Sequence, residues 1–126
     1  MIQAGSYLNV VDNSGAKKVL CIKILQGGFK QRYASIGNMI LVSIKSVKFS
    51  DNLKVKKGEL HRALIIRTKV QQYSLISNYK KYYQNSVVLL NKKHKNIGTR
   101  IFGLIPKKFK YSKFLRLTSI SSGLTF

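Results

Sequence analysis

Side chains capable of acid–base, metal or nucleophilic chemistry are scarce in this chain. Its 126 residues include only three acids, two histidines and one cysteine. Asp12, Asp51 and Glu59 are far apart in the sequence, whereas catalysis and metal binding require clusters of such groups. Cys21 lies in the apolar run Val19-Leu20-Cys21-Ile22, which is typical of a packed, unreactive thiol. The composition therefore argues against an enzyme, and no cofactor or metal is expected.

Cationic side chains, in contrast, are abundant. Lysine and arginine number 24 against three acids, which gives a formal net charge of +21, and from Leu60 to Phe126 there are 14 cations and no acid. They form four clusters, at Lys17-Lys18, Lys54 with Lys56-Lys57, Lys92-Lys93 with Lys95, and Lys107-Lys108 with Lys110. Most charge runs are only a solvated surface. Here the cations lack protein counter-charges, so phosphate groups are the natural partners and the sequence predicts a nucleic-acid-binding protein.

The kind of nucleic acid is indicated by the motifs that the sequence lacks. We find no helix-turn-helix pattern, no paired zinc-ligand spacing and no aromatic strand motif of the RNA-recognition type. Gln26-Gly27-Gly28 lacks the setting of a phosphate-binding loop and is interpreted as a turn. Basic loops on a small β domain suit the irregular phosphates of a folded RNA, which is recognised by shape. Structured RNA is therefore favoured over duplex DNA.

The elements that must hold these cations are mainly strands. Short runs rich in Val and Ile alternate with turn residues such as Asp12-Asn13-Ser14-Gly15 and Lys57-Gly58, and this spacing is typical of a small β-barrel. The five expected strands are Tyr7–Val11, Val19–Leu25, Met39–Val47, Leu60–Arg67 and Ser86–Leu90. Within the third, strict alternation places Lys45 on the face opposite Val42 and Ile44. We expect one domain over residues 1–126, with the barrel covering about 1–103.

Two segments depart from the barrel pattern. Residues 70–86 are polar and aromatic, so we expect a projecting ribbon whose tyrosines either stack on bases or cover the ribbon and meet a protein neighbour. Over about 104–120, Pro106 can open a helical turn, and Phe114, Leu117 and Ile120 recur on one helix face, which predicts a short helical region packed on the barrel. The tail 121–126 is expected to fray. No apolar run is long enough for a membrane-spanning helix, and no leader segment is expected.

A series of motifs extends along the chain. It begins with Met1-Ile2-Gln3, Leu8-Asn9-Val10, Asp12-Asn13-Ser14-Gly15-Ala16-Lys17-Lys18 and Cys21-Ile22-Lys23, and continues through Arg32-Tyr33-Ala34, Val55-Lys56-Lys57-Gly58, Arg67-Thr68-Lys69, Val88-Leu89-Leu90-Asn91 and Ile97-Gly98-Thr99-Arg100-Ile101-Phe102-Gly103. Together these motifs resemble the large-subunit ribosomal protein fourteen family, the universal L-fourteen family. The resemblance covers the whole chain. It implies a mainly β fold, a five-stranded barrel with a projecting β-ribbon and one or two short C-terminal helices, which agrees with the strands expected above.

The resemblance also implies a function. Family members are structural constituents of the large subunit that bind large-subunit rRNA and help form a bridge to small-subunit rRNA beside ribosomal protein nineteen. By resemblance, Thr99, Arg100 and Lys113 match the face used for bridging and for docking a ribosome-silencing factor. The family pattern and the basic clusters together predict rRNA contacts at Asn13, Ser14, Gly15, Lys17, Lys18, Arg32, Lys45, Lys54, Lys56, Lys57, Arg67, Lys69, Lys107 and Lys108.

The chain departs from the family in places. The ribbon tip has Ile76-Ser77 where Asp-Gly is usual, so a looser loop is expected, and Leu104 replaces the usual proline with Pro106 two places on. Few acids with abundant Lys, Ile, Asn, Tyr and Phe resemble a chain encoded in an AT-rich organelle genome. We therefore favour a mitochondrial ribosome, with plastid and bacterial origins as alternatives. A free RNA chaperone or translational regulator on the same barrel is the alternative function.

Overall fold

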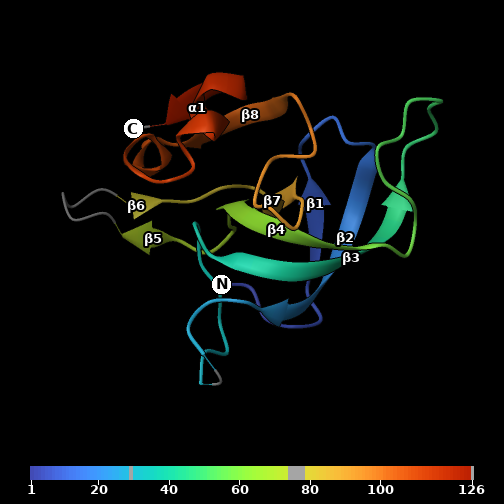
Figure 1. Ribbon diagram of the computed structural model, residues 1–126. Coiled ribbons are helices and arrows are strands. Elements are labelled where there is room, and N and C mark those ends of the chain that lie inside the picture. Colours follow the sequence, from blue (N-terminus) through green and yellow to red (C-terminus); the bar gives the residue numbers. More distant parts are fainter. Residues whose placement is uncertain (29, 74–78, 126) are drawn as a thin grey trace.

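Five strands close into a barrel in the computed structural model, which describes residues 1–28, 30–73 and 79–125. They are β1 (Tyr7–Val10), β2 (Ala16–Ile24), β3 (Met39–Val47), β4 (Leu60–Arg67) and β7 (Ser86–Leu90). Neighbours pair antiparallel in the order β1-β2-β3-β4-β7, and a parallel pairing of β1 with β7 closes the cylinder. The expected five-stranded barrel is confirmed (Figure 1).

The barrel interior is filled by branched aliphatic side chains. Alternate residues of β3, such as Ile40, Val42 and Ile44, are fully buried, while Lys45 lies on the outer face as expected. All five residues of β7 are buried. Each fully buried Val, Leu or Ile contributes about 1.5–3 kcal/mol relative to its exposed state. The barrel is thus the stable frame from which the basic loops project.

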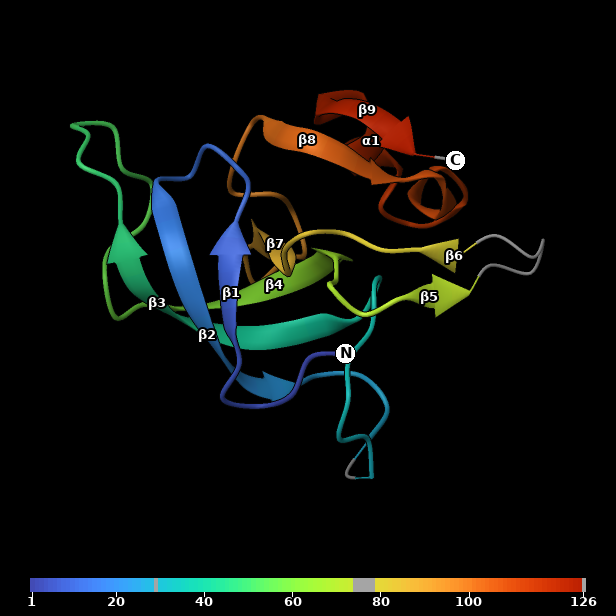
Figure 2. The same ribbon diagram turned by 180° about the vertical axis from the view of Figure 1, so that it is seen from behind.

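A two-stranded ribbon projects from the barrel between β4 and β7. Its strands are β5 (Gln72–Tyr73) and β6 (Tyr79–Lys80), which pair antiparallel with Tyr73 opposite Tyr79. Figures 1 and 2 both show the ribbon extending beside the C-terminal part of the chain. The expected ribbon is confirmed for the described residues, whereas its departure from the family at Ile76-Ser77 lies outside them.

The C-terminal part forms a small layer of its own against the barrel. Strand β8 (Ile101–Pro106) leads into the 3-10 helix η1 (Lys107–Tyr111), the helix α1 (Leu115–Ile120) and strand β9 (Ser121–Thr125). Phe109 and Leu117 are buried in the common core. The expected short helices are confirmed, and Pro106 stands directly before η1.

Two expectations for this end are wrong. Residues 121–125 do not fray but form β9, and residues 104–106 belong to β8 rather than to a helical region. The two strands pair in parallel, with Leu104 opposite Gly123, and Tyr82 contacts Thr125 through their hydroxyl groups at 3.1 Å. The connection through η1 and α1 returns the chain to the start of β8, so that β9 runs parallel to β8. A polar segment thereby gains backbone hydrogen-bond partners that its own sequence does not predict.

Candidate nucleic-acid interface

The turn after β1 is built around a buried carboxylate. Asp12 accepts hydrogen bonds from the Ser14 amide at 3.0 Å, from the Ser14 hydroxyl, and from the Leu89 amide at 3.0 Å. A buried carboxylate is costly unless such donors surround it. Asp12 therefore fixes the turn to β7, and the hydroxyl of Ser14, one of the expected rRNA contacts, is already used within the protein.

Asn13 connects this turn to the one before β8. Its Oδ1 accepts hydrogen bonds from the backbone amides of Thr99 at 2.7 Å and Arg100 at 3.2 Å, and its Nδ2 donates to Thr99 Oγ1 at 2.7 Å. Gly98 packs so closely that an added Cβ would lie 2.8 Å from Asp12 Cβ. The side chain that sequence reasoning assigned to rRNA thus holds the turn that carries the expected bridging residues Thr99 and Arg100.

The loop between β3 and β4, residues 48–59, packs against these two turns at the same end of the barrel (Figures 1 and 2). The carbonyl groups of Ser14 and Gly15 accept hydrogen bonds from the amides of Lys54 and Lys48 at 3.0 and 2.8 Å. Gly15 is buried with φ +100, and an added Cβ would lie 2.3 Å from Leu53 Cδ2, so glycine alone fits there. Gly15 therefore has no exposed surface for the predicted rRNA contact, but it allows close packing of the loop that carries Lys54, Lys56 and Lys57.

The exposed lysines at this end come from three elements. Lys17 and Lys18 are adjacent in β2 yet both exposed, because the pairing of β2 with β3 shifts register between Ala16 and Lys18. Lys54 donates to the Ile97 carbonyl at 3.4 Å, which draws the loop between β3 and β4 towards the turn before β8. Lys45, Lys56 and Lys57 are also exposed. The structure thus brings five of the predicted rRNA-binding lysines to one end of the barrel, with Lys45 on the adjoining outer face.

Two of the predicted cations face the protein instead. Arg67 donates to the carbonyl of Phe102, and burial lowers the pKa of its guanidinium. Lys108 donates to the Ile36 carbonyl at 2.5 Å, and burial, followed by the nearby charge of Lys80, lowers the pKa of its ammonium group. Both side chains tie the C-terminal layer to the barrel. Lys69 and Lys107 are exposed.

The expected bridging residues lie around helix α1. Thr99 and Arg100 line a groove with Ser119, Ile120, Ser121 and Ser122. Lys113 lines a neighbouring groove, which it shares with His94, Lys95 and Arg116, and Ser119 borders both grooves. Lys113 also sits over the ring of Phe114 at 5.4 Å. The structure therefore brings all three residues to one region, although 99–100 and 113 come from different elements.

Arg32 is remote from the other predicted residues. It lines a groove of about 750 Å³ together with Gln3, Lys23, Gln31 and Tyr33, among others, where β2 ends. Sequence reasoning did not assign Gln3, Lys23, Gln31 or Tyr33 to a site. The sequence does contain a signal for this groove. Lys23 lies between Ile22 and Ile24, and Tyr33 directly follows Arg32, so each cation is adjacent in the sequence to apolar or aromatic residues.

The described part of the chain contains no metal-ligating cluster, no exposed thiol and no membrane-spanning helix. No cluster of three His, Cys, Asp or Glu residues that could hold a metal ion occurs among residues 1–28, 30–73 and 79–125. Burial raises the pKa of the Cys21 thiol, which keeps it protonated. No helix within these ranges is long and apolar enough to span a membrane.

Comparison with known protein families gives one match that extends over nearly the whole chain. The family model described as ribosomal protein L14p/L23e matches residues 1–125. The matched region includes the turn at Asp12, the loop bearing Lys54 to Lys57, the ribbon and the C-terminal layer.

Proposed function

This chain belongs to the ribosomal protein L14p/L23e family, whose members are structural proteins of the large ribosomal subunit, and we propose how it serves there. It binds large-subunit rRNA through the exposed lysines at the loop end of the barrel. Thr99, Arg100 and Lys113 contact small-subunit rRNA across the subunit interface. Ribosomal protein nineteen is its neighbour, and a ribosome-silencing factor docks on the same three residues.

The observation that carries rRNA binding is the lack of protein counter-charges for the cations. Among the described residues no carboxylate forms an ion pair with a Lys or Arg side chain, and Glu59 instead contacts the His61 ring at 3.0 Å. Hydrogen bonds from His61 and from the Lys56 amide lower the pKa of Glu59. Asp12 is buried and bonded within the barrel. Phosphate oxygens are therefore the counter-charges that this surface requires.

The cellular location is a mitochondrial ribosome on this proposal. Its support is compositional: three acids among 126 residues, with a high content of Lys, Ile, Asn, Tyr and Phe. The family match favours the ribosomal role over a free RNA chaperone or translational regulator. The two roles differ in stoichiometry, since a ribosomal constituent is present once per large-subunit rRNA at moderate salt and a regulator is not.

The salt dependence of binding tests the role of the turn lysines. Affinity for large-subunit rRNA is measured over a range of salt for the native chain and for the double variant Lys17→Ala/Lys18→Ala. Each phosphate contact contributes about 0.7–0.9 to the slope of log K against log salt, so loss of two contacts in the double variant is expected to flatten the slope by up to about 1.8.

The matched control is Lys17→Arg/Lys18→Arg, which keeps both charges and should keep the slope. An unchanged slope in the alanine variant would remove these lysines from the interface. Co-sedimentation with large subunits at about one copy per particle supports the ribosomal role, and a small fraction of a copy argues for the free regulator.

A further inference from the structure

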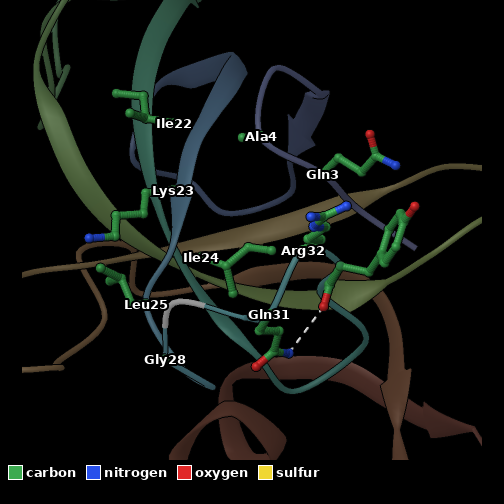
Figure 3. A pocket seen from close by; sticks show the side chains of 10 residues that line it. Gln3, Ala4, Ile22, Lys23, Ile24, Leu25, Gly28, Gln31 and Arg32 are labelled. Carbon is green, nitrogen blue, oxygen red and sulfur yellow. Dashed lines mark hydrogen bonds between the residues drawn. The ribbon is translucent and has the colours of Figure 1, made fainter.

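A groove at the end of the barrel opposite the Asp12 turn combines apolar and cationic side chains. It is formed by the last residues of β2, the segment Gln3-Ala4 and the loop that follows β2, and its volume is about 750 Å³. Figure 3 shows Ile22, Lys23 and Leu25 on one side and Arg32 with Gln3 on the other, with Ile24 and Gln31 between them. The two cations therefore stand at opposite sides of one hollow.

The groove is held in shape by hydrogen bonds within the protein. Ile2 and Ala34 exchange two backbone hydrogen bonds of 2.8 Å, which join the N-terminal segment to the loop. Gln31 Nε2 donates to the Tyr33 carbonyl at 3.0 Å. The Gln31 side chain crosses Gly27, where an added Cβ would lie 1.3 Å from Gln31 Oε1 and φ is +97. Because these contacts hold the described residues that line the groove, a ligand finds their side chains already in place and the ordering cost is small.

The groove exposes apolar and aromatic side chains to solvent beside two cations. The side chains of Ile22, Leu25 and Tyr33 remain 42%, 39% and 50% exposed. Lys23 and Arg32 are exposed beside them, and no acid lines the groove. These groups fit a ligand with three properties. The apolar and aromatic side chains suit a flat apolar ring, the amide groups of Gln3 and Gln31 suit hydrogen-bonding edges, and the two cations suit negative charge.

An RNA duplex does not meet these requirements, because its backbone presents phosphates and ribose while its bases remain stacked inside. An unpaired nucleotide does, since its base is free to stack on an aromatic ring and its flanking phosphates lie to either side. We propose that this groove binds a single unpaired nucleotide of the large-subunit rRNA. The base lies against Tyr33 and the apolar side chains of Ile22 and Leu25, and Lys23 and Arg32 contact the adjacent phosphates. This inference rests on the proposed function.

Binding of two RNA probes to the purified full-length chain tests the groove. The probes are hexauridylate and an RNA duplex of about twelve base pairs, measured by fluorescence anisotropy at fixed salt. Loss of the ring in Tyr33→Ala is expected to weaken hexauridylate binding about tenfold, and to leave duplex binding unchanged. Tyr33→Phe keeps the ring and should bind as the native chain does.

The control for removal of an exposed tyrosine is Tyr111→Ala, since Tyr111 is 78% exposed in η1 and lies outside the groove. Circular dichroism confirms that each variant is folded. Equal hexauridylate affinity in Tyr33→Ala and the native chain would overturn the inference, as would a parallel loss of duplex binding. If the native chain bound neither these probes nor large-subunit rRNA, the proposed function itself would fail, so the two failures are distinguishable.

Discussion

The amide of Asn13 joins two turns that lie 86 residues apart in the sequence. All three of its hydrogen bonds stay within the protein, at 2.7, 2.7 and 3.2 Å. Two of them hold the backbone of Thr99 and Arg100, and the third holds the Thr99 hydroxyl, while the side chains of both residues remain exposed. We therefore propose that Asn13 positions the turn that carries the expected bridging residues, rather than binding rRNA itself.

Replacement of Asn13 separates these two roles. In Asn13→Ala the Thr99–Arg100 turn loses its side-chain anchor, so we expect subunit joining to fall while incorporation into large subunits is kept. Arg100→Ala, which removes the guanidinium that is proposed to contact small-subunit rRNA, should impair joining in the same way and serves as the reference. The loss of the bonds costs about 1–3 kcal/mol of stability. Joining is measured by sedimentation of large and small subunits at limiting magnesium.

The informative comparison is Asn13→Asp. Aspartate keeps an oxygen for the Thr99 and Arg100 amides, and the Thr99 hydroxyl can donate to it, so a positioning role predicts that joining is restored relative to alanine. A direct contact with phosphate predicts the reverse, because a negative charge is repelled. Joining that is worse in Asn13→Asp than in Asn13→Ala would therefore contradict the positioning role.

Other single residues show where sequence reasoning reaches its limit. The sequence identified the cations and the turn at Asp12, because charge and turn chemistry are local properties. Which cations face inwards depends on distant carbonyl groups, such as Phe102 for Arg67 and Ile36 for Lys108. With few acids available, these two cations are stabilised by backbone carbonyl dipoles, and no local sequence pattern predicts which cations will be held in this way.

At the scale of elements, the five barrel strands were predictable because they are short runs rich in Val and Ile that turn residues separate. The expected and observed bounds of 39–47, 60–67 and 86–90 coincide. Strands β8 and β9 were not predictable in this way. Gly103 has φ +82 and the pairing shifts register between Ile101 and Leu104, so the alternation of β8 is broken. Strand β9 depends entirely on its partner.

The C-terminal layer should depend on one face of α1. Leu117 is buried at 1% exposure, whereas Leu115, two residues earlier in the same helix, is 54% exposed. Leu117→Ala is expected to lower the free energy of unfolding by about 2–4 kcal/mol through lost burial and the cavity left behind. Leu115→Ala removes the same atoms from solvent-exposed surface and should change it by less than about 0.5 kcal/mol.

Urea unfolding followed by circular dichroism measures both variants. Because α1 connects η1 to β9, the Leu117 variant should also release the C-terminal strand, which protease digestion would reveal as cleavage near residue 120. Equal stability of the two variants would mean that α1 is not anchored through Leu117.

At the scale of the whole molecule, the fold brings many positively charged side chains close together, and these repel one another. The three acids are too few to offset 24 cations, and one of the acids is buried. A net charge this far from zero destabilises the compact state of the free protein. In a ribosomal particle phosphate removes that repulsion, so binding and folding stability are linked: what binds the folded chain also stabilises it.

The linkage predicts that simple salt stabilises the isolated chain. Raising the sodium chloride concentration from about 0.01 M to about 0.1 M shortens the Debye length from about 30 to about 10 Å and so screens the loop lysines from one another. We expect the melting temperature to rise by several degrees, since about 1 kcal/mol corresponds to roughly 3–6 °C for a chain of this size.

Replacing Lys17, Lys18, Lys56 and Lys57 with Gln lowers the net charge to 21 − 4 = +17. This variant should begin from a higher melting temperature at low salt and respond less to added salt. If salt changed the melting temperature of neither the native chain nor the Gln variant, repulsion among these lysines would not destabilise the folded protein.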